Sequence, residues 1–281
     1  VVQLTAMHLK ITILVDNQAG QGLAGEHGFA LWIEAGTERI LFDTGQGSAL
    51  ADNARKLGVG LERADRIVLS HGHYDHTGGI PEATSRAPQA EVYCHPGVVL
   101  PRYSIRNGTP KPIQMPRESM TALDKLPAHR LHWVQQPVRL TERVGITGPI
   151  PRETGFEDPG GPFYLDAEGK RSDPVTDDLA VWIRTATGLV VCVGCSHAGL
   201  VNTLNHVLRL NPDSRIRAVV GGFHLLNASA ERVDRTIAGL QSLRPDRVVP
   251  CHCTGENAAK KIGAAFGHDA LLGQSGMRLQ F

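Results

Sequence analysis

The segment LSHGHYDHTGGI (69–80) concentrates side chains that bind metals. His71, His73, Asp75 and His76 fall within six positions, after an apolar run and before a glycine pair. Imidazole and carboxylate groups are ligands that borderline divalent metals such as zinc favour, and neighbouring pairs suit two ions that share a water. Two such ions can polarise a substrate oxygen and convert the water to hydroxide near neutral pH. The spacing therefore predicts a metal centre for hydrolysis or a related displacement, with Asp75 holding the nucleophilic water.

Three more histidines follow short apolar runs later in the chain. They are His197 in GCSHAG, His224 in GGFHL and His252 in PCHCTG. Because ligands gather beyond the carboxyl ends of strands in α/β sheets, we expect these loops to converge on one edge. For His224 the interpretations are a hydrogen bond to substrate, a metal bond, or a satisfied structural histidine.

Strands and helices are expected on either side of each histidine loop. Apolar alternation predicts a strand at 9–15 and a hairpin that turns at 35–37, and helical spacing predicts a helix within 47–58. Later in the chain, LAVWI and GLVVCVG predict a second hairpin that ends at the CSHAG loop. The repeated order of strand, histidine loop and helix indicates an α/β fold.

Residues 96–176 are expected to form a cap-like insertion over the site, within a single domain that spans residues 1–281. The segment is rich in Pro, Gly and Arg and has weak periodicity, as functional lids often do. Its aromatic residues disfavour a disordered linker because they can anchor it to a core.

The composition limits the choice of partners. Lys and Arg number 29 against 28 Asp and Glu, so no global field attracts nucleic acid or an anionic membrane. No apolar stretch approaches the ~20 residues of a membrane helix, and the 5 cysteines are an odd number, which favours reduced thiols. We expect a cytoplasmic protein with a small, anionic substrate that is bound locally, and association with further copies of the chain is left open.

Several motifs together resemble a known family. LSHGHYDHTGG resembles the His-x-His-x-Asp-His signature of the metallo-β-lactamase superfamily, and LFDTG (41–45) resembles its preceding strand motif, in which Asp43 would orient the metal loop. A narrower branch includes the dihydropterin ribofuranosylaminobenzene 5′-phosphate synthase. The motifs that resemble this branch are EHGF (26–29), SHGHYDHTGG (70–79), TGPIPRETGFE (147–157), GCSHAG (194–199), GGFHL (221–225) and PCHCTG (250–255).

The resemblance implies an αββα sandwich, with two mixed β-sheets back to back and helices outside. It implies a metal-dependent hydrolase or transferase that acts on a small anionic, ester- or phosphate-containing molecule, with a pterin-related substrate as one option. Metal-activated water or a metal-polarised leaving group would carry the step. Two alternatives remain open: a catalytically weak, metal-containing ligand-binding or regulatory protein, and an iron-containing redox enzyme.

The resemblance also implies a ligand set for one or two divalent ions, with zinc favoured over manganese or iron. Where the superfamily has a bridging aspartate this sequence has Cys195, and no histidine precedes LAVWI, where the family supplies one. Cys195 and Asp178 are therefore candidate ligands beside the main set, which consists of His71, His73, Asp75, His76, His197 and His252.

Substrate contacts are expected from His224 and from two residues in the branch motifs. These are Arg152, whose guanidinium suits phosphate or carboxylate, and His27, which follows a glycine-rich loop. Alternation along a strand predicts that the thiols of Cys251 and Cys253 point away from His252 and stay unreactive.

Overall fold

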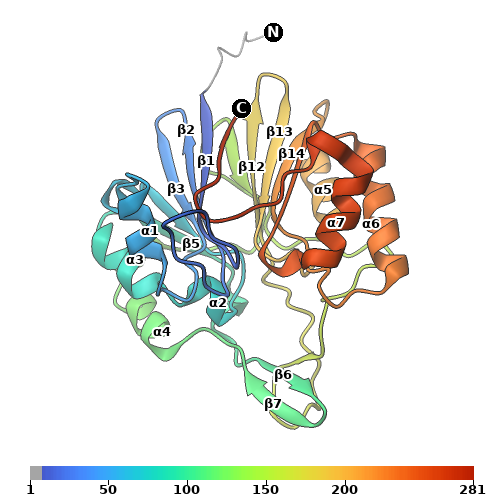
Figure 1. The fold of residues 1–281 in the computed structure, drawn as a ribbon. Coiled ribbons are helices and arrows are strands. Elements are labelled where there is room, and N and C mark those ends of the chain that lie inside the picture. Colours follow the sequence, from blue (N-terminus) through green and yellow to red (C-terminus); the bar gives the residue numbers. More distant parts are fainter. Residues whose placement is uncertain (1–7) are drawn as a thin grey trace.

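Two mixed β-sheets stack face to face, and helices cover the outer face of each sheet (Figure 1). The computed structural model describes residues 8–281. Most of the first sheet comes from the first half of the chain, and the second half supplies most of the second sheet. This arrangement confirms the predicted αββα sandwich. No helix in the described part of the chain is long and apolar enough to cross a bilayer.

The first sheet contains, in spatial order, β16 (Arg278–Gln280), β1 (Leu9–Val15), β2 (Ala30–Ala35), β3 (Glu38–Phe42), β4 (Arg66–Val68), β5 (Glu91–Cys94) and β8 (Leu131–Trp133). The predicted strand at 9–15 and the hairpin that turns at 35–37 are both present. β3, β4, β5 and β8 are parallel, so their carboxyl ends lie at one edge of the sheet.

The second sheet contains, in spatial order, β15 (Arg247–Cys251), β14 (Ile216–Gly222), β13 (Gly188–Val193), β12 (Ala180–Thr185), β10 (Val144–Ile146) and β9 (Val138–Arg139). The predicted second hairpin is confirmed as β12 and β13. β13, β14 and β15 are parallel, and a histidine follows the end of each one.

The helices lie in the connections between parallel strands, except for α7, which follows the last parallel strand. The first sheet is covered by α1 (Leu50–Lys56), α3 (Ile80–Arg86) and α4 (Arg117–Asp124), and the second by α5 (Leu200–Leu210), α6 (Ala230–Leu243) and α7 (Glu256–Phe266). The short helix α2 (Tyr74–Thr77) lies within the metal-binding segment. Single 3-10 turns occur at η1 (Leu61–Arg63), η2 (Pro96–Val99), η3 (Ala128–Arg130), η4 (His252–Thr254) and η5 (Gly267–Asp269).

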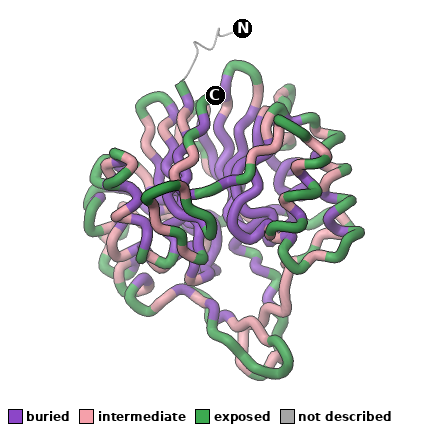
Figure 2. The backbone as a smooth tube through the Cα atoms, in the orientation of Figure 1, coloured by how far each residue is buried: buried purple, intermediate pink, exposed green. Residues whose placement is uncertain are grey.

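Apolar side chains form three buried layers. One layer lies between the sheets, where Ile33 of β2 and Val181 of β12 belong to the same cluster. The other two lie between each sheet and its helices. Figure 2 shows the buried backbone concentrated in the strands. Because strands covered on both faces bury every side chain, they have the continuous apolar sequences seen before each histidine loop.

A small third sheet projects from one end of the sandwich (Figure 1). We call it the flap; it consists of β11 (Phe163–Tyr164), β6 (Tyr103–Arg106) and β7 (Thr109–Pro112). The prediction that residues 96–176 form one cap needs correction, because β8 extends the first sheet and β9 and β10 extend the second. The apolar residues of β10 pack in the layer between the sheets, which draws that strand into the body of the fold. The assignment of residues 1–281 to one domain stays a prediction.

A buried ion pair joins the flap to the metal-binding segment. Arg102, directly before β6, is fully buried, and its guanidinium donates to both carboxylate oxygens of Asp177 at 2.5 and 2.8 Å. Its Nε lies 2.8 Å from a carboxylate oxygen of Asp173. Asp177 also accepts a hydrogen bond from the backbone N–H of Gly72, the central residue of the HGH motif, at 2.8 Å. The position of the flap is therefore coupled to the backbone that carries the histidines.

Replacing Asp177 by alanine should destabilise the fold strongly, because it leaves a buried guanidinium with one carboxylate partner. Breaking a buried pair costs about 3–5 kcal/mol. Denaturant unfolding monitored by circular dichroism measures this loss. Asp234→Ala is the matched control, because the pair between Asp234 and Lys261 is exposed and should contribute little. Equal effects of the two substitutions would contradict the role assigned to Arg102 and Asp177.

Candidate metal centre

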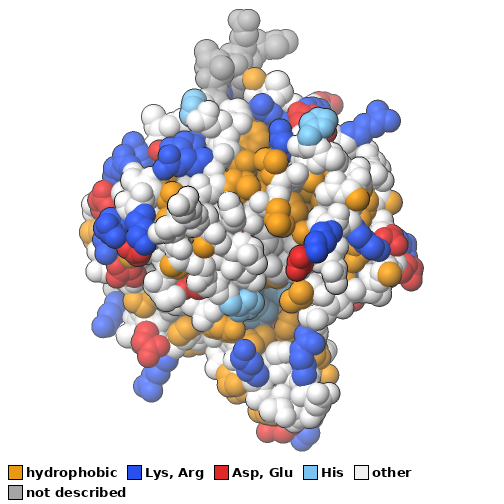
Figure 3. Space-filling model, in the orientation of Figure 1, with side chains coloured by type: hydrophobic (Ala, Val, Ile, Leu, Met, Phe, Trp, Pro, Cys, Tyr) orange, Lys and Arg blue, Asp and Glu red, His pale blue; other side chains and the backbone are white. Residues whose placement is uncertain are grey.

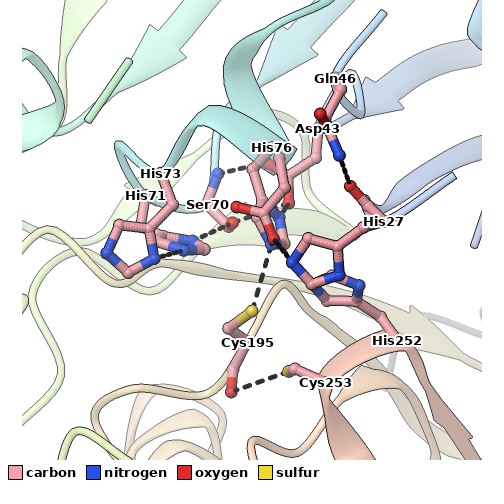
Figure 4. A network of polar contacts seen from close by, with 12 residues as sticks. His27, Asp43, Gln46, Ser70, His71, His73, His76, Cys195, His252 and Cys253 are labelled. Atoms are coloured by element: carbon pink, nitrogen blue, oxygen red, sulfur yellow. Dashed lines mark hydrogen bonds and ion pairs between the residues drawn. The ribbon is translucent and has the colours of Figure 1, made fainter. Parts of the chain in front are cut away.

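Four loops bring their histidines together at one edge of the two sheets. Figure 4 shows His71, His73 and His76 of the first loop facing Cys195 and His252. The HGHYDH segment follows β4, the GCSHAG loop follows β13, His224 follows β14, and His252 follows β15. This is the convergence expected from the carboxyl ends of parallel strands. The predicted metal-binding histidines of these loops are buried, and His224 is half-buried.

One group of ligand-type atoms consists of His71, His73 and His197, whose ring nitrogens lie within 4.8 Å of one another. Nε2 of His71 is 2.9 Å from Nδ1 of His73. Without a cation, one of these two nitrogens must carry the proton that they share. A cation at the same place would take that role, so the geometry suits a three-histidine metal site.

A second group consists of His27, Asp75 and His252. One carboxylate oxygen of Asp75 lies 3.2 Å from Nε2 of His252, 3.2 Å from Nε2 of His27 and 3.9 Å from Nε2 of His76. His27 was predicted as a substrate contact; its side chain is 53% exposed, so it stands where the centre opens to solvent. In Figure 4, His76 and Cys195 lie between this group and the rings of His71 and His73.

Hydrogen bonds to Nδ1 orient four of the imidazoles. When Nδ1 donates, the tautomer is fixed and Nε2 keeps its lone pair for a metal, which is the common arrangement of metal-binding histidines. Nε2 of His197 is buried and has no hydrogen-bond partner among residues 8–281, and the buried Nε2 of His252 has only the Asp75 carboxylate beside it. The Nδ1 partners are the Ser70 hydroxyl for His71 at 2.9 Å, Asp43 for His76 at 2.7 Å, the Pro159 carbonyl for His197 at 2.7 Å, and Asn17 Oδ1 for His252 at 2.8 Å.

Asp43 has the orienting role that the LFDTG motif implies. Its carboxylate accepts hydrogen bonds from the Ser70 N–H and hydroxyl, both at 2.7 Å, and from His76 Nδ1. Asp43 has a φ of 60° and follows the end of β3, where the chain turns toward the loop. A Cβ on Gly194 would meet the Ser70 hydroxyl, so glycine allows the loop of the second sheet to approach this network closely.

Cys195 lies at the centre of the cluster. Its Sγ is 3.1 Å from Nε2 of His76, and it belongs to three of the five groups of ligand-type atoms found among the described residues. It therefore stands between the two histidine groups, where the superfamily pattern expects a bridging aspartate.

The predicted position of Cys253 is wrong. Its thiol forms a group with Cys195 and His252 instead of pointing away. The alternation rule fails because β15 ends at Cys251 and the chain turns at His252, which has a φ of 47°. For Cys251 the prediction is confirmed, since its side chain packs in the apolar layer between the sheets.

Asp178, a predicted candidate ligand, is in none of the ligand groups found within residues 8–281. Its carboxylate accepts a hydrogen bond from the Ala198 N–H at 2.7 Å. Burial raises the pKa of this carboxyl to about 7, against the lowering effect of that hydrogen bond. Asp178 therefore supports the backbone of the loop that carries His197, and the side chain is directed to that backbone.

Arg152 holds two loops together. One terminal nitrogen donates to the carbonyl of His197 at 2.6 Å, and the other contacts the carbonyls of Pro174 and Val175. These contacts direct both terminal nitrogens of the guanidinium to backbone carbonyls. They give Arg152 a positioning role, and its predicted contact with substrate stays a prediction.

His224 and Phe163 complete the wall on the flap side. The ring of His224 lies 4.3 Å from that of His197, and His224 also forms a ligand group with Cys195 and His197. Phe163 of β11 lies 5.2 Å from the His73 ring and 5.4 Å from the His197 ring. Sequence reasoning identified Phe163 only as an apolar anchor, because no local pattern shows that the flap folds back onto the histidines.

Burial and charge divide the imidazoles into two electrostatic classes. Burial, reinforced by neighbouring cationic groups, holds the pKa of His71, His73 and His197 well below the ordinary value, so these rings are neutral and ready to bind a cation. Burial also opposes protonation of His76, but the carboxylates of Asp43 and Asp75 outweigh it and raise the pKa to about 9.

Metal binding should therefore displace a proton from His76 at neutral pH. Below a pH of about 9 the metal-free His76 imidazole is protonated, and a bound metal must displace that proton. The affinity for the metal should therefore rise by up to about tenfold per pH unit as the pH increases toward 9. Above that pH, the ionisation of His76 should add nothing further to the affinity. Zinc titration calorimetry in buffers of different ionisation enthalpy counts the protons released. Asp43→Asn should lower the pH at which the affinity stops rising. An unchanged pH would contradict the assignment of this proton to His76.

The comparisons with known proteins agree with this geometry. Residues 23–252 match the family model of the metallo-β-lactamase superfamily. Two proteins of Methanocaldococcus jannaschii are similar. One is an uncharacterised protein with 33% identity, in a match that covers 92% of this chain and 97% of that one. The other is 7,8-dihydropterin-6-methyl-4-(beta-D-ribofuranosyl)-aminobenzene-5'-phosphate synthase, with 28% identity in a match that covers 98% of this chain and 97% of that one. The crystal structure of a metal-dependent hydrolase of the β-lactamase superfamily has a TM-score of 0.81 at 28% identity and covers 97% of this chain and 99% of that one. The chain thus belongs to the metallo-β-lactamase superfamily.

Proposed function

We propose that this protein is a metal-dependent hydrolase or transferase that acts on a small anionic molecule containing an ester or phosphate group. The observation that carries the proposal is the buried cluster of imidazoles held through Nδ1, in which Nε2 of His197 has no hydrogen-bond partner among residues 8–281 and Nε2 of His252 lies 3.2 Å from the carboxylate of Asp75. A divalent cation bound there supplies Lewis acidity and lowers the pKa of water. Zinc is the ion proposed, because imidazole and thiol groups dominate the donor set.

The proposed roles build on the two groups of ligand-type atoms, with His76, which lies 3.9 Å from Asp75 Oδ2, in place of the half-exposed His27 in the second group. His71, His73 and His197 would hold one ion, while Asp75, His76 and His252 would hold or complete a second. Asp75 Oδ2 is also placed to orient a water and accept its proton. His27 lies 3.2 Å from that oxygen and is half exposed, so it can pass the proton to solvent.

Lys111 supports an anionic substrate. It is exposed on β7 of the flap, its Nζ lies 5.6 Å from the centre of the Tyr74 ring, and Tyr74 lies 6.3 Å from the His27 ring. Lys111 has no ion pair among residues 8–281. Figure 3 shows histidine at the floor of a hollow with Lys and Arg side chains on the lobe below it. A cation at this rim would meet an anionic group of a bound molecule.

The pterin-related option rests on the synthase relative, whose name specifies a dihydropterin and a 5′-phosphate. At 28% identity that relative supports testing such molecules, together with simpler phosphodiesters, esters and lactones. The phosphate is the part of that name that Lys111 would recognise.

Chelation and Asp75→Asn test the central role of the metal. Both should reduce hydrolysis or transfer at least about 100-fold, and added zinc should restore the chelated wild type but not the variant. Glu256→Gln is a control, because that exposed carboxylate pairs with Lys260 on α7. Full activity after exhaustive chelation would contradict the proposal. Purified protein that contains stoichiometric iron and shows an optical band would favour a redox enzyme. A protein whose metal site is filled but which converts none of the pterin-related molecules, phosphodiesters, esters and lactones would favour a binding protein.

Lys111→Ala should raise KM for phosphate-containing substrates about three- to tenfold and leave kcat nearly unchanged, because the lysine binds a group distant from the reacting bond. Lys111→Arg should retain most of the affinity. Steady-state kinetics at two salt concentrations measures the effect, with Lys125→Ala on the far end of α4 as the control. The idea fails if the alanine variant is kinetically identical to the wild type.

A further inference from the structure

Two buried thiols lie inside the cluster, and only one of them occupies a position where the superfamily pattern expects a ligand. We propose that Cys253 joins Cys195 as a sulfur ligand of the metal centre, which makes the centre selective for thiophilic ions such as zinc, cobalt or iron over manganese or magnesium. The inference rests on the proposed metal centre and adds a residue and a metal class to it.

The geometry carries the assignment. Ligand-type atoms of Cys195, His252 and Cys253 lie within 4.8 Å of one another, and all three residues are buried. The imidazole of His252 is held by Asn17 at Nδ1, and its buried Nε2 lies 3.2 Å from the carboxylate of Asp75, which can share an ion with it. A pair of thiols beside an oriented imidazole is a donor set that divalent zinc and cobalt bind well.

The backbone is shaped to present Cys253. The positive φ of His252 ends the alternation of β15, and the next side chain lies against Gly222 at the end of β14. A Cβ on Gly222 would come 2.5 Å from the Cys253 sulfur, so the absence of a side chain there provides the room that the thiol occupies. The contact of this sulfur with the Cys195 carbonyl is long, at 3.8 Å, and does not account for its position.

The other cysteines offer a direct contrast. Cys94, Cys192 and Cys251 pack among apolar side chains in the sheet layers, and none of them is in a group of ligand-type atoms found among residues 8–281. Cys195 and Cys253 instead belong to one group of ligand-type atoms with His252, and each would bind a metal as the thiolate.

Cobalt-substituted protein gives a test that does not depend on activity. Thiolate bound to cobalt produces an intense charge-transfer band in the near ultraviolet, whereas nitrogen and oxygen ligands alone leave only weak d–d bands. We expect the band in the wild type, a reduced band in Cys253→Ser and in Cys195→Ser, and its loss in the double variant. Cys94→Ala, a buried thiol outside the cluster, should retain the full band. An unchanged band in Cys253→Ser would overturn the assignment of Cys253.

Metal competition tests the selectivity. The ratio of the affinity for zinc to the affinity for manganese should fall in the double variant. The fall should exceed ~10–100-fold, which is the effect of changing a residue that only neighbours a metal ligand. An unchanged preference would contradict the proposal. Thermal unfolding of each metal-free variant establishes that it folds.

X-ray absorption at the zinc edge of the wild type covers the case in which a variant does not fold. The proposal requires sulfur in the first coordination shell, at an average of about one or more per ion. A shell of nitrogen and oxygen alone would overturn it. Such a protein could still hydrolyse substrate with bound zinc, so this failure would leave the proposed function standing; a protein that binds no divalent ion would remove both.

Discussion

The carboxylate of Asp43 accepts hydrogen bonds from the amide and hydroxyl of Ser70 and from His76, and much of the centre is arranged around these contacts. The Ser70 hydroxyl donates to Asp43 and can therefore accept from Nδ1 of His71. One buried carboxylate thereby orients an imidazole on each side of the cluster. Such buried networks are stable only when each polar atom is satisfied, which leaves little freedom in how the rings point.

This network also fixes how closely the two sheets approach. Gly194 lies against Ser70 and Asp43, and a Cβ at that position would stand 3.0 Å from the Asp43 carboxylate. The next residue, Cys195, is thereby placed 3.1 Å from His76. On the other side, Arg102 and Asp177 connect the flap to the same segment through Gly72. The centre thus depends on contacts between parts of the chain that are distant in sequence.

The sequence predicted the features that local pattern determines. The strands before each histidine loop are continuous apolar runs, and their parallel arrangement brings His71, His197 and His252 to one edge, as expected. The αββα layers themselves were implied by the resemblance of the motifs to the superfamily. Features that depend on a turn or on distant packing could not be predicted in this way. The positive φ of His252 reverses the expected direction of Cys253, and the apolar residues of β10 draw part of the expected cap into the second sheet. Likewise, Asp178 lies before its strand as expected, but its partner is the amide of Ala198.

Two groups of side chains, with Cys195 between them, would hold the divalent ions. Anomalous scattering from crystals grown with zinc, recorded on both sides of the zinc absorption edge, locates such ions. We expect a peak enclosed by His71, His73 and His197, and a second peak beside Asp75, His76 and His252 if the centre holds two ions. The absence of any zinc peak among these residues, with zinc bound elsewhere or not at all, would contradict this assignment.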